Sequence, residues 1–292
     1  MSDAKKTAGA EEAPKQELNP INPRIMRRFP SAGRGRLWQN VAQSDWSDWM
    51  WQQRMRVRTL EQLEKTIDVT DDERHAYNGS VEMFNMSITP YYAALMDPED
   101  PNCPSRLQAV PKSRELNIGV HDMDDPLGEE KDMPVPGITH RYPDRVLFYT
   151  THNCAMYCRH CTRKRKVSDP SSAAQKQQLD VGLDYIRNHP EIRDVIISGG
   201  DPLSNSDERL DHILSSLRGM DHIEVFRLGT RNLVTLPQRI NDDFIYMIKK
   251  HQPVYIHTHF NHPKECTEEA MEACRRLADA GCPTNNQMVL LK

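Results

Sequence analysis

Residues 146–161 read VLFYTTHNCAMYCRHC. The first six are apolar, aromatic or threonine, which predicts a buried β-strand because such residues pack well on a pleated surface. Cys154, Cys158 and Cys161 follow, so that one loop carries three thiols. A parallel α/β sheet places its active site in loops at the carboxyl ends of its strands. The stretch therefore predicts both a strand and a site.

The three thiols favour an iron-sulfur cluster. A cubic 4Fe-4S cluster usually takes four cysteines, so three leave one iron open to bind another molecule. The alternative is a structural zinc ion, but that site needs four closed ligands and no fourth ligand stands at similar spacing. The chain has seven cysteines, an odd number that favours reduced thiols over a disulfide framework. The other four are expected to pack as small hydrophobes: Cys103, Cys266, Cys274 and Cys282.

Further apolar runs recur along the second half of the chain. They begin near Val146, Asp194, Glu224, Pro253 and Gln287. The segments between them carry apolar residues at helical spacing, and one of them is bounded by Thr267 as a cap and Gly281 as a stop. Strands that alternate with helices predict right-handed βαβ units, an α/β fold and a parallel sheet. The period alone leaves open whether that sheet closes into a barrel.

The composition changes along the chain and suggests four parts. These are a disordered, basic leader (1–36), a mainly helical N-terminal subdomain (37–125), a linker and pre-barrel segment (126–145) and the α/β core (146–292). All four tryptophans lie between Trp38 and Trp51 and should pack the helical part. Thr70 and Glu73 form a capping-box pattern that opens a helix. A final strand at Gln287 would be a bare edge, so we expect the sequence to be a piece of a longer protein.

Composition excludes some classes of partner. The net charge is −4 and charged residues make up 27% of the chain, without the basic excess of a nucleic-acid-binding protein. No apolar run approaches the ~18 residues that a membrane span needs. The first residues have no apolar core like that of a secretory signal. We therefore expect a cytoplasmic protein without a nucleic-acid or membrane partner.

The motifs around the cysteines resemble a known family. CX3CX2C with Tyr157 before the second cysteine resembles the signature of radical S-adenosylmethionine (SAM) enzymes. The flanking stretches ITPYY, DPLGEE, VPGITHRYPDRVLF, VIISGGDPL, VTLPQRI and THFNHP are similar to the lysine 2,3-aminomutase family. The resemblance covers about residues 44–292 and implies a partial (β/α) barrel of the radical SAM type.

The resemblance also implies roles for particular residues. Cys154, Cys158 and Cys161 would hold a 4Fe-4S cluster. The positions expected to face SAM are Ser198, Gly199, Gly200, Asp201, His259 and Gln287. Arg141, Tyr142 and Arg145 would bind the phosphate of pyridoxal 5'-phosphate (PLP), and Arg163 the substrate's α-carboxylate. From the residues alone, the glycine pair could be an ordinary turn, HRYPDR a charged turn, and His259 and Gln287 satisfied polar residues of the core.

The implied reaction is a 1,2-amino shift that converts L-lysine to L-β-lysine, started by a 5'-deoxyadenosyl radical made from SAM. Glutamate and arginine 2,3-aminomutases share most of these motifs. A non-catalytic iron-sulfur or electron-transfer module is the alternative from another class. The implied partners are an amino acid substrate, an electron donor such as flavodoxin or ferredoxin, and further copies of the chain.

The family's PLP-anchoring lysine, its substrate-selecting acidic residues and a possible structural zinc site would lie beyond residue 292. Lys292 itself is not favoured as that anchor, because its position usually carries arginine in relatives. We therefore expect the 292 residues to assemble a cluster without turnover of an amino acid.

Overall fold

The computed structural model describes residues 29–80, 84–167 and 176–290. Its centre is a six-stranded sheet in the order β1-β2-β3-β4-β5-β6. The strands are β1 (Ile138–Tyr142), β2 (Arg145–Thr151), β3 (Asp194–Gly199), β4 (Val225–Gly229), β5 (Tyr255–Thr258) and β6 (Thr284–Asn286). β1 is antiparallel to β2, and each later pair of neighbours is parallel. The predicted parallel sheet is confirmed, with an antiparallel strand added at one edge.

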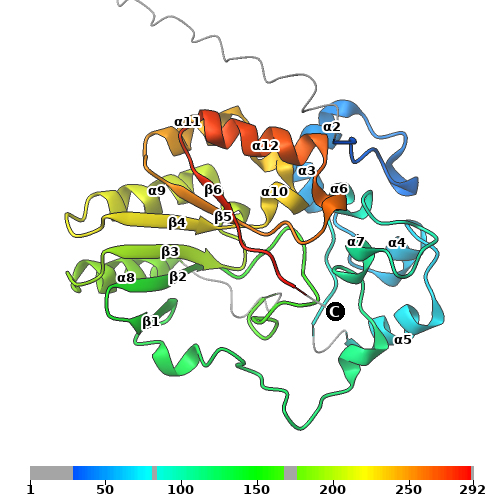
Figure 1. Ribbon diagram of the computed structural model, residues 1–292, viewed down its shortest axis with the longest axis horizontal. Coiled ribbons are helices and arrows are strands. Elements are labelled where there is room, and N and C mark those ends of the chain that lie inside the picture. The colour runs from blue at the N-terminus through cyan, green and yellow to red at the C-terminus, as the bar shows by residue number, and fades with distance from the viewer. Residues whose placement is uncertain (1–28, 81–83, 168–175, 291–292) are drawn as a thin grey trace, which may run out of the picture.

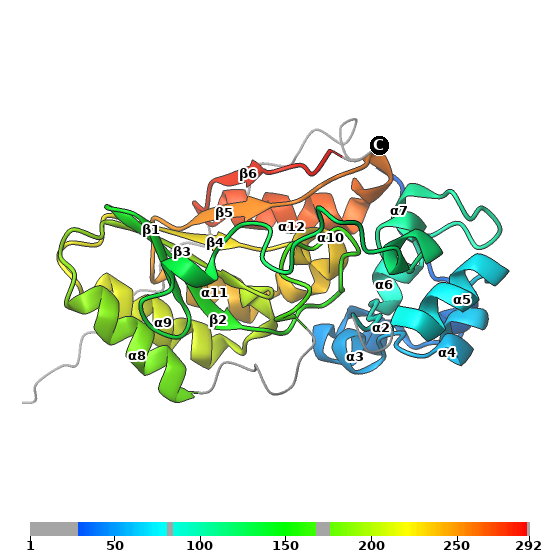
Figure 2. The ribbon, with the colours of Figure 1, turned by 90° about the horizontal axis from the view of Figure 1, so that it is seen from below.

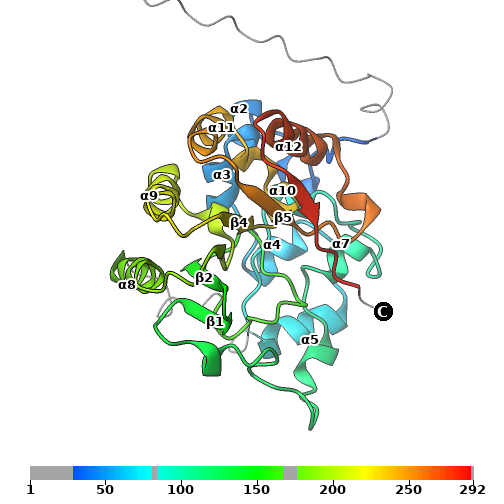
Figure 3. The ribbon, with the colours of Figure 1, turned by 60° about the vertical axis from the view of Figure 1, so that its left-hand side comes forward.

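Long helices cover one side of this sheet. They are α8 (Lys176–Arg187), α9 (Asp207–Arg218), α11 (Asp242–Lys249) and α12 (Glu268–Asp279). Figure 3 shows them in an arc outside the curved sheet. β1 and β6 are the two edges of the described sheet and do not pair with each other. The α/β core is thus an unclosed, partial (β/α) barrel, as the sequence and its resemblance predicted.

Local sequence explains where these helices begin. Ser206, Asn241 and Thr267 each accept a hydrogen bond from a backbone N–H three residues further on. Such caps satisfy amides that have no partner within the helix, and each contributes about 1 kcal/mol. The expected cap at Thr267 is confirmed, and Gly281 follows the end of α12 with φ +78°. The apolar stripe of each helix packs on the strands in one continuous core.

Short elements connect the strands and helices at the carboxyl end of the sheet. They are η5 (Pro202–Ser204), α10 (Asn232–Thr235), η6 (Pro237–Arg239) and η7 (Pro263–Glu265). The parallel strands point toward the N-terminal helices, which lie beyond the strand ends rather than over a face of the sheet (Figures 1 and 2). The loops at the strand ends therefore lie between the core and the N-terminal region.

The N-terminal region is helical, as expected. Its elements are η1 (Arg36–Trp38), α2 (Gln43–Ser47), α3 (Trp49–Arg54), α4 (Leu60–Glu64), α5 (Asp71–Ser80), α6 (Pro90–Ala93), α7 (Pro104–Leu107), η2 (Ser113–Leu116) and η3 (Glu130–Asp132). Trp38 and Trp46 are buried in a second core, and Trp51 packs against it. The capping box is confirmed, since the Thr70 amide donates to Glu73 Oε2 at 2.9 Å and the Glu73 amide to Thr70 Oγ1 at 3.3 Å.

The last strand differs from the prediction. We expected it to begin at Gln287, but β6 ends at Asn286 and residues 287–290 are not a strand. The Gln287 amide still donates to the Thr258 carbonyl at 2.7 Å, but side-chain carbonyl oxygens accept the neighbouring backbone amides. The Phe260 amide donates to Asn286 Oδ1 at 2.8 Å, and the Val289 amide to Asn261 Oδ1 at 2.9 Å. The chain leaves the edge of the sheet after the polar residues of β6.

Residues 126–145 were expected to form a linker and pre-barrel segment. Within them, Ile138–Tyr142 form β1, a strand that was not predicted, whose Ile138 pairs with Phe148 of β2. Most of the basic leader, residues 1–28, lies outside the described residues, as does Lys292. No helix in the described ranges is long and apolar enough to cross a membrane.

Candidate functional site

The cysteine loop lies where β2 ends and is fixed by the N-terminal region. The Tyr157 amide donates to the carbonyl of Ser87 at 2.9 Å, and the Arg159 amide to that of Gln108 at 2.9 Å. Arg56 Nη1 donates to the carbonyl of Cys154 at 2.6 Å. These bonds cross between the two halves of the molecule, so the loop takes its shape only when both halves are in place.

The glycine pair after β3 packs on the same loop. Gly199 has φ +116°, and a Cβ there would lie 2.4 Å from the carbonyl oxygen of Thr151. A Cβ on Gly200 would lie 2.4 Å from the carbonyl oxygen of Asn153. The Gly200 amide donates to the Thr151 carbonyl at 2.7 Å. Only glycine permits this approach of two backbones. The approach places Ser198–Asp201 beside the cysteine loop, while their expected role in binding SAM stays a prediction.

The three thiols are close enough to influence one another. Burial raises the pKa of Cys154, and the charges of Asp201 and Cys161 raise it further. Burial and the neighbouring Cys158 likewise raise the pKa of Cys161. A thiol cluster of this kind needs a compensating positive charge before it can ionise, and bound metal supplies such a charge because it deprotonates its thiols. The donor set therefore fits an iron-sulfur cluster.

The cysteines do not converge on one point. Among the described residues, no three His, Cys, Asp or Glu side chains are arranged around a single metal ion. In a cubic cluster each cysteine binds a different iron, so its ligands need not share one centre.

A buried arginine supplies positive charge beside the loop. Arg231 follows β4, and its Nη1 donates to Cys158 Sγ at 2.8 Å. Its Nη2 donates to Glu265 Oε1 at 2.8 Å and to Gln108 Oε1 at 2.6 Å. Burial alone would lower the pKa of Arg231, but the nearby Cys158, Tyr92 and Glu265 raise it above its usual value. The guanidinium thus stays charged next to a candidate cluster ligand.

Asp201 connects the loops that follow β3 and β4. The backbone amides of Leu203 and Arg231 and the hydroxyl of Thr230 donate to its carboxylate, at 3.0, 2.7 and 2.7 Å. Burial raises the pKa of Asp201, while these three donors act in the opposite direction. Both oxygens are engaged, so in this structure Asp201 ties the loop after β3 to the loop after β4. Its expected contact with SAM stays a prediction.

His259 and Gln287 come together at the far side of the site. His259 Nδ1 lies 2.6 Å from the carbonyl oxygen of Gln287. Burial lowers the pKa of His259, and the charges of Arg231 and Arg163 lower it further. Burial, Arg231 and His259 lower the pKa of His160, in the cysteine loop, to about 4. His259 therefore lies near the cysteine loop, and its expected contact with SAM stays a prediction.

Arg163 lies two positions after Cys161 and holds a carboxylate. Its Nη2 donates to Glu129 Oε1 at 2.6 Å and its Nε to Glu129 Oε2 at 3.0 Å. The Tyr149 hydroxyl donates to Glu129 Oε2 at 2.6 Å. Burial would lower the pKa of Arg163, but the hydrogen bonds and charges of Glu129 and Tyr149 raise it. The guanidinium already binds a carboxylate in the two-pronged geometry expected for a substrate.

The basic run after Arg163 has structural partners. Lys164 Nζ lies 3.5 Å from Glu115, and Arg165 lies 2.9 Å from Asp125 and 3.0 Å from Glu130. Glu115 belongs to η2, Glu130 to η3 and Asp125 to the segment between them. The run therefore anchors that segment and is not a free cationic surface.

The expected PLP-phosphate residues lie at the other end of β2. Arg145 opens that strand, and its guanidinium lies 5.5 Å from the ring centroid of Tyr142. Arg141 Nε donates to Asp132 at 2.6 Å and its Nη2 to the Gly128 carbonyl at 3.0 Å. Two part-exposed guanidinium groups beside a tyrosine are a donor set that suits a phosphate. The structure groups these three residues but does not place them beside the cysteines.

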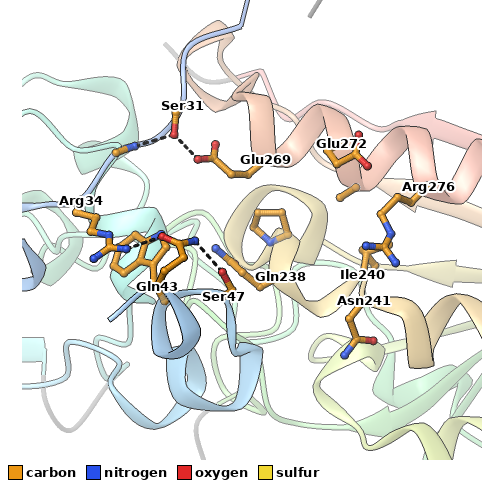
Figure 4. Close-up of a pocket in the computed structure, with 14 residues that line it drawn as sticks. Ser31, Arg34, Gln43, Ser47, Gln238, Ile240, Asn241, Glu269, Glu272 and Arg276 are labelled. Carbon is orange, nitrogen blue, oxygen red and sulfur yellow. Dashed lines mark hydrogen bonds between the residues drawn. The ribbon is translucent and has the colours of Figure 1, made fainter. Parts of the chain in front are cut away.

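A pocket of about 410 Å³ opens elsewhere, between the N-terminal region and α12 (Figure 4). Glu269 and Arg276 of α12 face Arg34 and Gln43 across it. None of the predicted site residues lines this pocket.

Sequence reasoning missed Arg56, Glu129 and Arg231. Arg231 had a usable signal, because it is a charged residue directly after a buried parallel strand. Glu129 lies in the DPLGEE stretch but gave no sign of its partner. Arg56 had no signal, since its contact is with a backbone carbonyl 98 positions away.

Comparisons with known proteins agree with this geometry. The family model of the Radical SAM superfamily matches residues 148–292. The chain is 50% identical over 256 residues to the L-lysine 2,3-aminomutase of Clostridium subterminale, covering 88% of this chain and 62% of that protein. It is 45% identical over 258 residues to a putative L-lysine 2,3-aminomutase of Aquifex aeolicus, covering 88% of this chain and 70% of that protein.

A relative with a different substrate in its name is nearly as similar. The glutamate 2,3-aminomutase of Clostridioides difficile is 46% identical over 252 residues, covering 86% of this chain and 60% of that protein. The chain spans about three-fifths of the length of several of these curated relatives. From the cysteine loop, the unclosed barrel and these identities, the chain belongs to the radical SAM superfamily and, within it, to the lysine 2,3-aminomutase family.

Proposed function

We propose that this chain carries the radical-generating part of an aminomutase that converts L-lysine to L-β-lysine. The observation that supports this best is the three-cysteine loop at the carboxyl end of the sheet, with the charged Arg231 2.8 Å from Cys158. The 50% identity to proteins named L-lysine 2,3-aminomutase supports the same reaction. When bound, the cluster and SAM would supply a 5'-deoxyadenosyl radical, and PLP would supply a conjugated ring that delocalises the unpaired electron while the nitrogen migrates.

The residues of this chain hold and orient the cofactors and the substrate. Cys154, Cys158 and Cys161 hold the cluster. Gly199 and Gly200 let the backbone after β3 lie against the cysteine loop, and with Ser198, Asp201, His259 and Gln287 they form the SAM side of the site. Arg231 keeps positive charge beside Cys158, at 2.8 Å from its sulfur.

Substrate and PLP are bound by guanidinium groups. Arg163 binds the α-carboxylate of the amino acid in place of Glu129, because the two carboxylates present the same pair of oxygens to its fork. Arg141, Tyr142 and Arg145 bind the PLP phosphate. An electron donor such as flavodoxin or ferredoxin, assembly with further copies of the chain and a cytoplasmic location, where thiols stay reduced, complete the proposal.

The second candidate is a 2,3-aminomutase for glutamate or arginine. The 46% identity to a protein named glutamate 2,3-aminomutase favours considering it. Arg163 does not separate these substrates, since all three carry the same α-carboxylate.

The test is product analysis. The protein, expressed from its complete reading frame and reconstituted with iron, sulfide, SAM and PLP under a reductant, is incubated separately with lysine, glutamate and arginine. We expect β-lysine as the main product. Formation of β-glutamate or β-arginine instead would assign glutamate or arginine as the substrate. If no 5'-deoxyadenosine is released with any of the three amino acids, the proposed radical reaction is contradicted.

A further inference from the structure

An exposed face of the N-terminal region lies against the outside of the cysteine loop. Helix α3 ends at Arg54, and the residues after it run past the loop. Arg56 Nε donates to the carbonyl of Gln53 at 2.8 Å, and its Nη1 to the carbonyl of Cys154 at 2.6 Å. One hydrogen bond therefore joins this face to the backbone of the first cysteine.

The side chains around Arg56 combine exposed methionines with arginines. Met50 and Met55 are 51% and 47% exposed. The side chain of Arg54 is 64% exposed, with Asp48 at 3.5 Å as its ion-pair partner. Arg58 is exposed, and within the described residues its guanidinium has no hydrogen bond or ion pair. Exposed methionine is a soft, adaptable contact residue, and unpaired arginine attracts an acidic partner.

The positive charge of this face lies next to the loop. Arg56 Nη1 is 2.6 Å from the carbonyl oxygen of Cys154, and the exposed Arg58 follows two positions later. The basic face therefore adjoins the loop that carries the cysteines.

We propose that Met50, Arg54, Met55, Arg56 and Arg58 form the docking face for an acidic one-electron carrier protein. This inference rests on the proposed function, because cleavage of SAM needs one electron per event. The reduced carrier loses one electron and the cluster gains it. The cluster then passes that electron to the sulfonium of SAM, whose C–S bond breaks to give methionine and the 5'-deoxyadenosyl radical. Charge complementarity selects an acidic carrier and speeds its encounter with the protein.

The test compares two reductants on one charge-reversal variant. Arg54→Glu/Arg58→Glu leaves Arg56, and therefore its bond to the loop, in place. Arg187→Glu is the matched control, because Arg187 of α8 is also exposed, at 53%, and pairs with Asp184. Cluster reduction is followed by stopped-flow absorbance, with reduced flavodoxin as the acidic carrier and photoreduced deazaflavin as a small neutral reductant. Flavodoxin affinity is measured separately on the same proteins.

We expect flavodoxin to reduce the double variant about tenfold more slowly at low ionic strength and to bind it more weakly. The difference should disappear near 1 M salt, where charges are screened within about 3 Å. The deazaflavin rate and the Arg187→Glu control should match the parent protein. If the deazaflavin rate also falls, Arg54→Gln/Arg58→Gln replaces the double variant, and the same selective loss is expected.

Unchanged flavodoxin rate and affinity in the charge-reversal variant would overturn the docking face. Equal slowing in Arg187→Glu would overturn it too, as would loss of self-association with carrier binding unchanged, which would assign the face to a second copy. The proposed function fails separately: a cluster that flavodoxin reduces through this face but that releases no 5'-deoxyadenosine would contradict the aminomutase and leave the docking face standing.

Discussion

Arg231 carries more buried polar interactions than any predicted site residue. Its side chain is 8% exposed and pairs with Glu265, which is 0% exposed. Removing one partner of a buried pair leaves the other charge without compensation, at a cost of about 3–5 kcal/mol. We therefore expect Arg231→Met to lower the free energy of unfolding by that amount in urea titrations.

A double variant separates charge from packing. Arg231→Met with Glu265→Gln removes both charges and should recover part of the loss, because the amide still receives bonds from Tyr92 and Gln108. A loss below about 1 kcal/mol in the single variant would show that the pair is not buried as described.

Glu73 couples stability to acid pH. It is fully buried between Arg106, at 2.6 Å, and Lys112, at 2.9 Å. Burial would raise the pKa of Glu73, but the hydrogen bonds from Arg106, Thr70 and Lys112 lower it to about 2. A folded-state pKa below the unfolded value stabilises the protein above pH ~4.5, and this stabilisation is lost as the pH falls toward 2.

The measurement is urea unfolding between pH 5 and pH 2.5. We expect the free energy of unfolding to fall across this range and Glu73→Gln to flatten the fall. Glu61→Gln, in an exposed pair with Lys65, is the control and should alter the slope far less. An unchanged slope in Glu73→Gln would count against a buried, ionised Glu73.

For single residues, the sequence predicted the candidate cluster ligands but not the residues that contact them. The cysteines stand out because three thiols in eight positions have few structural uses. Arg231 and Cys158 are 73 positions apart, and Glu129 and Arg163 are 34 apart, so only the folded chain joins them. Pairing of this kind depends on the approach of elements, which no local pattern encodes.

The contact between the end of β3 and the cysteine loop is the tightest junction of elements in the site. A Cβ on Gly200 would lie 2.4 Å from the Asn153 carbonyl oxygen and 2.8 Å from the His152 carbonyl carbon. Both are backbone atoms, so the loop itself must shift. We expect Gly200→Ala to lose most of its bound iron after reconstitution and about 1–3 kcal/mol of stability.

Gly229→Ala is the matched control for this junction. It ends the parallel strand β4, but the nearest atom to a Cβ there would be Ser198 Oγ, at 3.4 Å, and the nearest backbone atom the Ile197 carbonyl oxygen, at 3.8 Å. The measurement is the iron content and visible absorbance of both reconstituted variants, Gly200→Ala and Gly229→Ala. Equal iron retention in the two would mean that the glycine pair does not shape the loop.

A helix was predictable where apolar spacing and a cap agree, as in α12. The prediction failed at β6, whose residues are Thr284, Asn285 and Asn286. An edge strand needs backbone pairing with only one neighbour and little apolar character, so the apolar run at 287–291 drew the prediction away from it. β1 was missed because its strand pattern lies inside a charged segment.

The whole molecule is an unclosed barrel whose open end faces a helical region, and the cysteine loop is bound to both. On the helical side, the carbonyls of Ser87 and Gln108 accept hydrogen bonds from backbone amides of the loop. On the core side, the backbone of Gly199 and Gly200 packs against the first residues of the loop. The resemblance predicted the barrel and the helices, but not that both would make contacts that fix the cysteine loop. These contacts imply that cluster retention should depend on residues far from the cysteines in sequence.

We propose that the cysteine loop holds a 4Fe-4S cluster with one iron open to SAM. The most direct measurement is 5'-deoxyadenosine release from SAM by the anaerobically reconstituted, chemically reduced protein, with Cys158→Ser as the control. We predict equal amounts of 5'-deoxyadenosine and methionine from the parent protein and none above background from Cys158→Ser. A parent protein that holds a reduced 4Fe-4S cluster and leaves SAM intact would contradict the proposal that one iron of the cluster is open to SAM.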